Sequence, residues 1–386
     1  MRRRMRTGGI AVLAVLALLA GGCSSDDGTG AAGGSDDATE DTGGGPAGNP
    51  AAEEAQERAE AFLEDPTELR DLEPLSATPE EGKRIVWLRC SQPSCQVIGD
   101  NVVAAAEELG WEVDTIDFSN TEPESVIVAM NQALDSDPDG IALSGIPSDR
   151  IEEPLARAQE AGIPVISAAV VEEVGGIDGN GIIGLMGGPN SYETGASAVV
   201  DWVIADSGGD ANIAVFTVDD FPIIRFEAEA VQAHVEEACP DCTVTVVNQT
   251  TADIGTNTPG SVVSTIQENP DIDYVYFGFG DLSRGVTPAL LEAGLDAKVV
   301  GLAPTEENYQ RIIDGEEAAW ASWSTPLVGW DIVDGFARFY NGDDLDVIDD
   351  RAMTIQLFTE EHPPESESPI FPANYKDLYD EIWQVG

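Results

Sequence analysis

The sequence contains very little positive charge. Among its 386 residues, 18 are Lys or Arg and 72 are Asp or Glu, which gives a formal net charge of −54 at pH 7. Lysine occurs only at Lys83, Lys298 and Lys376. Nucleic acids and anionic lipid surfaces are bound by clusters of Lys and Arg, because these neutralise phosphate groups. The composition therefore argues against nucleic acid as a partner and against electrostatic attachment to an anionic membrane.

Histidine is equally scarce, and neither of the two histidines lies in a catalytic motif. His234 falls within a predicted helix and His362 within a proline-rich tail. No serine or cysteine nucleophile motif accompanies them, and the sequence contains no P-loop and no paired metal-binding histidines. We therefore predict that the protein is not an enzyme, and that it uses no cofactor and no metal.

The five cysteines divide into one single residue, Cys23, and two local pairs, Cys90 with Cys95 and Cys239 with Cys242. Such short-range pairs are typical of structural disulfides in an oxidising compartment. A zinc site made of all four paired cysteines is disfavoured, because the two pairs are far apart in the sequence and belong to different predicted lobes. We expect each local pair to form a disulfide.

The first 22 residues are typical of a signal peptide. Four arginines precede an unbroken apolar run from Ile10 to Ala20, which is too short to remain as a membrane-spanning helix. The run ends in Leu19-Ala20-Gly21-Gly22-Cys23, which resembles a bacterial lipobox, although Ala20 stands where leucine is preferred. The resemblance implies that Cys23 is lipidated and that it anchors the protein to the outer face of the cell membrane. A secreted protein cleaved nearby is the alternative.

The signal peptide is followed by two acidic segments. Residues 23–50 are rich in Gly, Ser, Asp and Thr and lack large apolar side chains, so we expect a disordered tether. Residues 51–82 open with helix-forming residues from Ala51 to Leu63, and we expect an acidic helical lead-in. The acidity of the chain fits a highly soluble extracytoplasmic protein or an adaptation to high salt.

From residue 84 onward, short apolar runs alternate with helical segments. The expected strands are 85–88, 112–118, 140–146, 164–168 and 181–185, then 212–218, 243–247, 273–279, 298–302 and 318–324. The expected helices are 97–109, 124–134, 149–161, 192–205, 222–238, 259–267, 282–293 and 306–313. This alternation predicts an α/β fold of two Rossmann-like halves, each with a parallel sheet flanked by helices. Ligands in such folds collect beyond the carboxyl ends of the strands, so the two halves would share one cleft.

Several stretches resemble one protein family. Asp139–Asp149 and Ala161–Ile166 are similar to the first lobe of type I periplasmic solute-binding proteins of ABC importers, in the ribose/galactose-binding branch. Asn190–Gly195 resembles the crossing into the second lobe, and Thr325–Gly329 the start of the returning helix. The resemblance implies a hinge of three crossovers, near residues 187–190, 324–326 and 351–359. The N-terminal lobe would comprise residues 83–188 and 326–352, and the C-terminal lobe residues 189–325 and 353–386.

The resemblance also implies a function. The protein would be a monomer that captures a small molecule between its lobes and delivers it to the permease and ATPase subunits of an ABC importer. A ligand-sensing lipoprotein that presents its ligand to a membrane receptor, without transport, is the alternative. Regulators of the lactose-repressor type share the fold but carry a DNA-binding headpiece, and this chain has a signal peptide in that place.

Candidate ligand contacts follow from position, because they lie just past the strands or beside the expected cleft. They are Ser91, Gln92, Ser144, Asp219, Phe221, Arg225, Asp281, Trp320 and Trp323. Arg225 lies where sugar-binding relatives place an arginine, and a surface ion pair is its alternative role. Where those relatives carry charged sugar clamps, this chain has Ala168-Ala169 and Ala303-Pro304. We therefore expect an apolar, aromatic cleft and a ligand that is sugar-like or a small aromatic or carboxylate compound, not a simple pentose or hexose.

Overall fold

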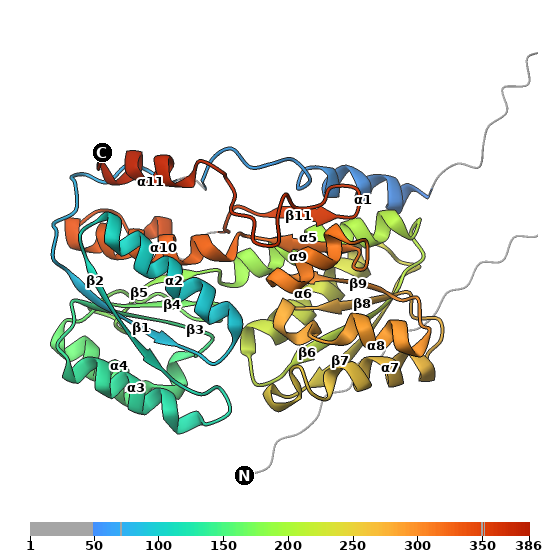
Figure 1. The fold of residues 1–386 in the computed structure, drawn as a ribbon, viewed down its shortest axis with the longest axis horizontal. Coiled ribbons are helices and arrows are strands. Elements are labelled where there is room, and N and C mark those ends of the chain that lie inside the picture. The colour runs from blue at the N-terminus through green and yellow to red at the C-terminus, as the bar shows by residue number, and fades with distance from the viewer. Residues whose placement is uncertain (1–48, 70–71, 349, 351) are drawn as a thin grey trace, which may run out of the picture. The chain divides into compact units, whose positions relative to one another are not determined.

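The structure is a computed structural model that describes residues 49–69, 72–348, 350 and 352–386 (Figure 1). The expected signal peptide, the lipidation at Cys23 and the tether as far as residue 48 lie outside the described residues. These three expectations therefore stay predictions.

The N-terminal lobe is built on a five-stranded sheet in the order β2-β1-β3-β4-β5. Its strands are β1 (Arg84–Arg89), β2 (Glu112–Asp117), β3 (Gly140–Ser144), β4 (Val165–Ala168) and β5 (Ile182–Met186), and all neighbouring pairs are parallel. The helices α2 (Pro93–Glu108), α3 (Pro123–Asp135) and α4 (Glu152–Ala161) lie against it (Figure 1). The central strands are apolar on both faces because helices cover both faces.

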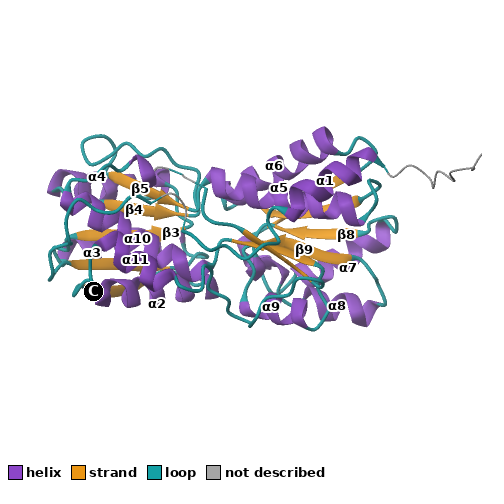
Figure 2. Ribbon diagram, turned by 90° about the horizontal axis from the view of Figure 1, so that it is seen from above, coloured by secondary structure: helices purple, strands orange, loops and turns teal. Residues whose placement is uncertain are grey.

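The C-terminal lobe is built on a six-stranded sheet in the order β11-β10-β9-β8-β6-β7. Its strands are β6 (Asn212–Val218), β7 (Thr243–Gln249), β8 (Tyr274–Phe277), β9 (Lys298–Leu302), β10 (Ala319–Ser322) and β11 (Gln356–Thr359). Only the β10–β11 pair is antiparallel. The helices of this lobe are α5 (Pro189–Asp206), α6 (Pro222–Ala238), α7 (Thr258–Glu268), α8 (Val286–Ala293) and α9 (Glu306–Ile313) (Figure 2).

The α/β fold class predicted from the sequence is confirmed, but the boundaries of several elements differ from those expected. Helix α2 begins at Pro93 and α5 at Pro189, several residues before the expected starts at 97 and 192. Proline is favoured in the first turn of a helix, since its fixed φ suits the helix and its missing N–H would have no partner there. Both helices therefore start directly at the edge where the two lobes meet.

The chain returns to the N-terminal lobe in α10 (Thr325–Asn341), whose main helical neighbour is α2. The two helices approach closely at Gly329. A Cβ at this position would lie 2.6 Å from the backbone nitrogen of Val102. Any side chain larger than hydrogen would therefore force the two helices apart.

The C-terminal tail crosses between the lobes once more than expected. β11 pairs with β10 of the C-terminal lobe, but α11 (Tyr375–Trp383) lies on α10 of the N-terminal lobe. The Trp383 ring stacks on Trp330 with 5.6 Å between centroids, and its Nε1 donates to Asp334 at 2.9 Å. The expected assignment of residues 353–386 to the C-terminal lobe therefore does not hold for α11.

Residues 49–82, which we call the lead-in segment, also contact both lobes. The helix α1 (Pro50–Glu60) packs on α5, where Arg58 forms a bidentate pair with Asp201 at 2.7 and 2.9 Å. Further along, Gln356 of β11 donates to Asp65 at 2.6 Å. The backbone N–H of Leu75 then donates to Ile382 at 2.8 Å, next to α10 and α11. Within the described part of the lead-in, α1 is the only α-helix, and the residues from Glu73 to Leu75 contact the N-terminal lobe.

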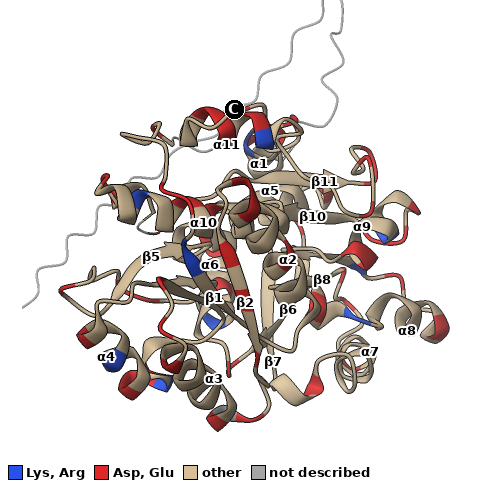
Figure 3. Ribbon diagram, turned by 60° about the vertical axis from the view of Figure 1, so that its left-hand side comes forward, with Lys and Arg blue, Asp and Glu red and all other residues tan. Residues whose placement is uncertain are grey.

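Acidic residues occur in all parts of the folded body, as the red segments of the ribbon in Figure 3 show. Most of the few cations pair with them at the surface, as Arg89 does with Asp117 at 2.6 Å and Arg311 with Glu316 at 2.6 Å. Exposed pairs of this kind contribute at most about 1 kcal/mol each. The choice between a merely soluble surface and one adapted to high salt stays open.

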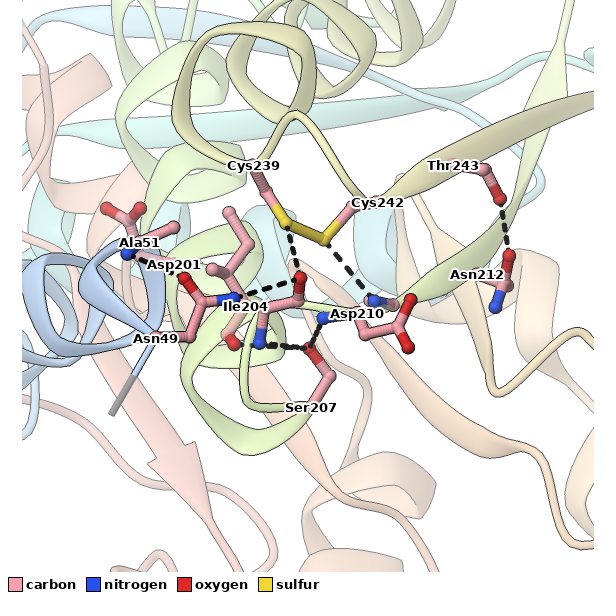
Figure 4. Close-up of a disulfide and its surroundings, with 12 residues drawn as sticks. Asn49, Ala51, Asp201, Ile204, Ser207, Asp210, Asn212, Cys239, Cys242 and Thr243 are labelled. Atoms are coloured by element: carbon pink, nitrogen blue, oxygen red, sulfur yellow. Dashed lines mark hydrogen bonds between the residues drawn. A yellow bond between two sulfur atoms is a disulfide. The ribbon is translucent and has the colours of Figure 1, made fainter. Parts of the chain in front are cut away.

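The two expected disulfides, Cys90–Cys95 and Cys239–Cys242, are both present. Cys239–Cys242 closes the turn between α6 and β7 (Figure 4). Cys239 Sγ lies 3.4 Å from the carbonyl oxygen of Gly209. Cys90–Cys95 joins the end of β1 to the first turn of α2. The two disulfides therefore brace different lobes.

Candidate ligand-binding cleft

A cavity of about 100 Å³ lies at the carboxyl ends of the strands of both sheets. Cys90, Ser144 and Ala168 contribute to its wall from the N-terminal lobe, and Phe279 and Ala303 from the C-terminal lobe. The residues that follow parallel strands meet at the same edge of a sheet, so the topology itself creates the cleft. Ligand pockets typically measure about 300–1,000 Å³, so the lobes have to separate to admit a ligand or the ligand is small.

Five of the nine predicted contact residues line this cavity. They are Gln92, Ser144, Phe221, Asp281 and Trp323. Ser91, Asp219, Arg225 and Trp320 do not line it. Ser91 is exposed and hydrogen-bonded to Asn120, and Asp219 is exposed beside Asn248. Whether the five residues bind a ligand stays a prediction.

The expectation that Trp320 faces the cleft is corrected by the structure. Trp320 is fully buried in the core of the C-terminal lobe, and its Nε1 donates to Glu317 at 2.8 Å. Trp323 lies three residues later and packs with the opposite core cluster, where it also lines the cavity. Trp320 lies in β10, and Trp323 directly follows this strand. Trp323 packs in the same core cluster as Ala319 and Ala321, whereas Trp320 packs in the other, because side chains along an extended chain alternate between two faces.

Arg225 requires a similar correction. It lies on α6, but its side chain is exposed and contacts no charged or polar partner among the described residues. The face of α6 that turns inward carries Ile223, Ile224, Glu227 and Ala228, and the two isoleucines line the cavity. A helix advances about 100° per residue, so Arg225 is turned away from this apolar stripe. The side chain lies at the surface, but the ion pair expected as its alternative role is not found among the described residues.

Several cavity residues were missed in the sequence. Tyr192 of α5 and Phe279, just after β8, contribute aromatic rings, and Ser94 of α2 contributes a hydroxyl. Tyr192 packs against Trp323 with 4.9 Å between ring centroids, and Phe279 against Phe221 with 6.1 Å. Phe279 was the last residue of the expected strand 273–279, so it was not counted among the residues past a strand; β8 ends at Phe277, and Phe279 therefore lies beyond it. Tyr192 lies inside a helix and carries no such positional signal.

Asp281 is the only charged residue among the described residues that line the cavity. It is 2% exposed and lies in the short helix η3 (Gly280–Ser283), ahead of the N-cap of α8 at Gly285. Ser94 of the other lobe donates to its Oδ2 at 2.9 Å, and Arg284 donates to its Oδ1 at 2.8 Å. Asp281 thus joins the two lobes across the cleft.

Two alanines of the cavity wall adopt a strained backbone. Ala169 follows β4 with φ of 52°, and Ala303 follows β9 with φ of 50°. This left-handed region costs a residue with a Cβ about 1–2 kcal/mol. Such strain persists where the surrounding structure requires a particular path of the chain. Here the chain has to turn directly after β4 and after β9.

Glu227 lies beneath the cavity floor and is completely buried. Burial raises its pKa well above the ordinary value, and the hydroxyl of Tyr276 donates to its Oε1 at 2.5 Å. Its Oε2 has no hydrogen-bond partner among the described residues. Desolvation penalises the charged form, so burial favours the protonated carboxyl.

We expect the Cys90–Cys95 disulfide to matter for binding, because both cysteines belong to the cavity wall. Replacing both with serine should weaken the affinity for a ligand of the cavity about tenfold or more, since the loop between them loses its covalent brace. The matched double replacement of Cys239 and Cys242 should change affinity by less than about twofold, since neither lines the cavity. Calorimetry on both variants measures this difference, and equal losses of affinity would contradict it.

Within the described residues, no group of three or more His, Cys, Asp or Glu side chains is arranged to hold a metal ion. None of the described helices combines the length and apolar character required to cross a bilayer.

The comparisons with known proteins agree with one another. A family model described as a periplasmic binding protein domain matches residues 86–343. An ABC sugar transporter subunit from Rhodobacter sphaeroides 2.4.1 is similar in structure, with a TM-score of 0.62, 20% identity and coverage of 72% of this chain and 98% of that chain. No curated protein matches the sequence.

Two further solved structures are similar. The 5-methylthioribose transporter solute binding protein from Thermotoga lettingae TMO, in complex with 5-methylthioribose, gives a TM-score of 0.63 and 17% identity, covering 75% of this chain and 89% of that chain. A periplasmic ribose ABC transporter from Conexibacter woesei DSM 14684 gives a TM-score of 0.60 and 18% identity, covering 74% of this chain and 94% of that chain. At these identities the likeness establishes the fold.

Proposed function

Because the chain belongs to the periplasmic binding protein domain family, we propose that it captures a small molecule between its lobes and delivers it to an ABC importer. The family consists of extracytoplasmic solute-binding proteins without enzymatic activity. The observation that carries the proposal is the cavity itself, whose wall comes from the strand ends of both lobes. A solute held there contacts both lobes at once, so its binding favours a closed arrangement that a permease can distinguish from an open one.

The experiment that tests this function is native mass spectrometry of the full chain carrying Cys23→Ser, purified without denaturation. A retained small molecule of defined mass supports the proposal. Addition of that molecule to ligand-free protein should reduce the radius of gyration in small-angle scattering. A protein that retains nothing and binds no member of a broad solute panel in a thermal-shift screen contradicts it, since ligand at 100 times its Kd would add about 2.7 kcal/mol of stability.

The membrane anchor is a separate proposal. We propose that Cys23 is lipidated after removal of residues 1–22, because the residues before it resemble a lipobox. The anchored protein should act as a monomer next to its permease. Cell fractionation should find the protein with the membrane, and Cys23→Ser should release it. If neither the parent nor the Cys23→Ser variant is released from the membrane, or if both are released equally, lipidation at this residue is contradicted.

A further inference from the structure

The wall of the cleft has an unusual chemical balance for a solute site. Asp281 is its one charged side chain, and none of the described residues in the lining is a Lys or Arg. Four aromatic rings accompany it, from Tyr192, Phe221, Phe279 and Trp323. We infer that the cleft binds a small organic cation of the alkylammonium class. This inference rests on the proposed function, because it names the class of solute for the same cleft.

Asp281 can accept a cation on the side that faces the cleft. Its Oδ1 is occupied by Arg284, whose side chain is 42% exposed and belongs to a neighbouring groove, not to the cavity. Its Oδ2 is held by the neutral hydroxyl of Ser94, and Ser94 and Asp281 line both the cavity and that groove. A cationic head group beside Oδ2 therefore meets a carboxylate that has one neutral donor on that side, in surroundings that screen charge weakly.

The aromatic rings favour the same ligand class. They form two contacting pairs, Tyr192 with Trp323 and Phe221 with Phe279, and all four belong to the C-terminal lobe that also carries Asp281. The face of an aromatic ring attracts a cation, most strongly for tryptophan and in desolvated sites. Methyl groups on the ammonium nitrogen also suit the apolar wall, since they need no hydrogen-bond partners.

The cleft is less suited to the competing ligand classes. A sugar presents hydroxyl groups on all sides. The ends of β4 and β9 offer it only Ala168, Ala169 and Ala303, so its hydroxyls would depend on the neutral polar side chains elsewhere in the wall, which are Gln92, Ser94, Asn120, Ser144 and Thr325. Buried hydroxyls without partners weaken binding. An anion would meet Asp281 without a cation in the wall, within the field of a chain of net charge −54. The carboxylate ligands left open by the sequence are therefore disfavoured.

The test is a series of ligands with matched shape and different charge. Choline, its neutral carbon isostere 3,3-dimethyl-1-butanol, and the anion 3,3-dimethylbutanoate are titrated by calorimetry into the full chain carrying Cys23→Ser, together with tetramethylammonium, ribose and glucose. Choline should bind about tenfold or more tightly than the neutral isostere, and the anion more weakly than either. Added salt should weaken the binding of choline more than that of the neutral isostere.

Two variants locate the effect. Asp281→Asn should reduce the preference for choline over its isostere to about threefold or less, while the isostere itself binds as before. Asp219→Asn removes the same charge from an exposed position outside the cavity and should leave the preference unchanged. Circular dichroism checks that each variant folds. If Asp281→Asn does not fold, Trp323→Leu should weaken binding of both ammonium ions.

The inference is overturned if ribose or glucose binds more tightly than the ammonium ions, or if choline and its neutral isostere bind equally. In either case a solute still binds in the cleft, so the proposed function stands. A protein that retains no molecule in native mass spectrometry and binds no compound of the panel contradicts both. A preference for choline that survives Asp281→Asn unchanged overturns the assignment of the charge recognition to Asp281.

Discussion

Trp383→Ala is expected to lower the free energy of unfolding by about 3–5 kcal/mol, as large-to-small changes at buried aromatic positions do. Trp383 is fully buried, stacks on Trp330 and contacts Tyr379 with 5.0 Å between ring centroids. Its Nε1 also donates to Asp334, which shares its carboxylate with Arg338 at 2.7 Å. Removal of the indole leaves a cavity and takes one donor from a buried carboxylate, and both effects are unfavourable.

Urea unfolding followed by circular dichroism measures this loss. The matched control is Val385→Ala, two residues further along and only half-buried, which should cost less than about 1 kcal/mol. Affinity for the retained ligand should be unchanged in the folded protein, because Trp383 does not line the cavity. A loss below about 1 kcal/mol for Trp383→Ala would mean that α11 is not part of the cooperative core.

Glu227→Gln is expected to make the protein more stable than the parent, by an amount that grows with pH. Burial raises the pKa of Glu227 in the folded state well above its ordinary value of 4.5. The folded protein therefore holds a proton that the unfolded chain releases above about pH 4.5. Between that pH and the raised pKa, the folding equilibrium constant of the parent declines about tenfold per pH unit through this group. Glutamine has a similar shape and cannot ionise, so the variant lacks this decline.

Unfolding curves at pH 5, 6, 7 and 8 measure the difference between Glu227→Gln and the parent. The other carboxylates titrate alike in both proteins, so the difference isolates Glu227. The control is Glu229→Gln, which removes an exposed carboxylate from the same helix and should give a difference that barely changes with pH. A constant difference for Glu227→Gln would contradict a protonated carboxyl at this position.

The sheets could be predicted because their strands are short continuous apolar runs, such as Ile85–Leu88, between helices of regular period. The tail beyond residue 353 could not be predicted as well. β11 has four residues, too few to show a pattern, and it pairs with β10 only through the tertiary fold. α11 has the helical spacing of Tyr375, Tyr379 and Trp383, but nearby prolines and charges masked it, and nothing in its sequence indicates which lobe it covers.

The position of a candidate along the chain was informative, whereas the direction of its side chain was not. Residues just past strands, such as Ser144 and Phe221, line the cavity as expected. Trp320 was misplaced because the alternation of side chains between the two faces of a strand had not been taken into account. Arg225 was misplaced because the apolar stripe of α6 was not used to orient the helix. Tyr192 and the Ser94–Asp281 contact depend on how two lobes meet, which a single sequence does not encode locally.

The lead-in segment limits how far its two attachment points on the lobes can separate. It is attached to the C-terminal lobe where Gln356 donates to Asp65, and to the N-terminal lobe where Arg338 donates to the carbonyl oxygen of Glu73 at 2.8 Å. The chain between Asp65 and Glu73 can span at most about 28 Å, at roughly 3.5 Å per residue. The segment therefore connects the two lobes by a chain of fixed maximum length. While both hydrogen bonds hold, the two attachment points cannot lie further apart than this length, and a larger separation must first break one of them.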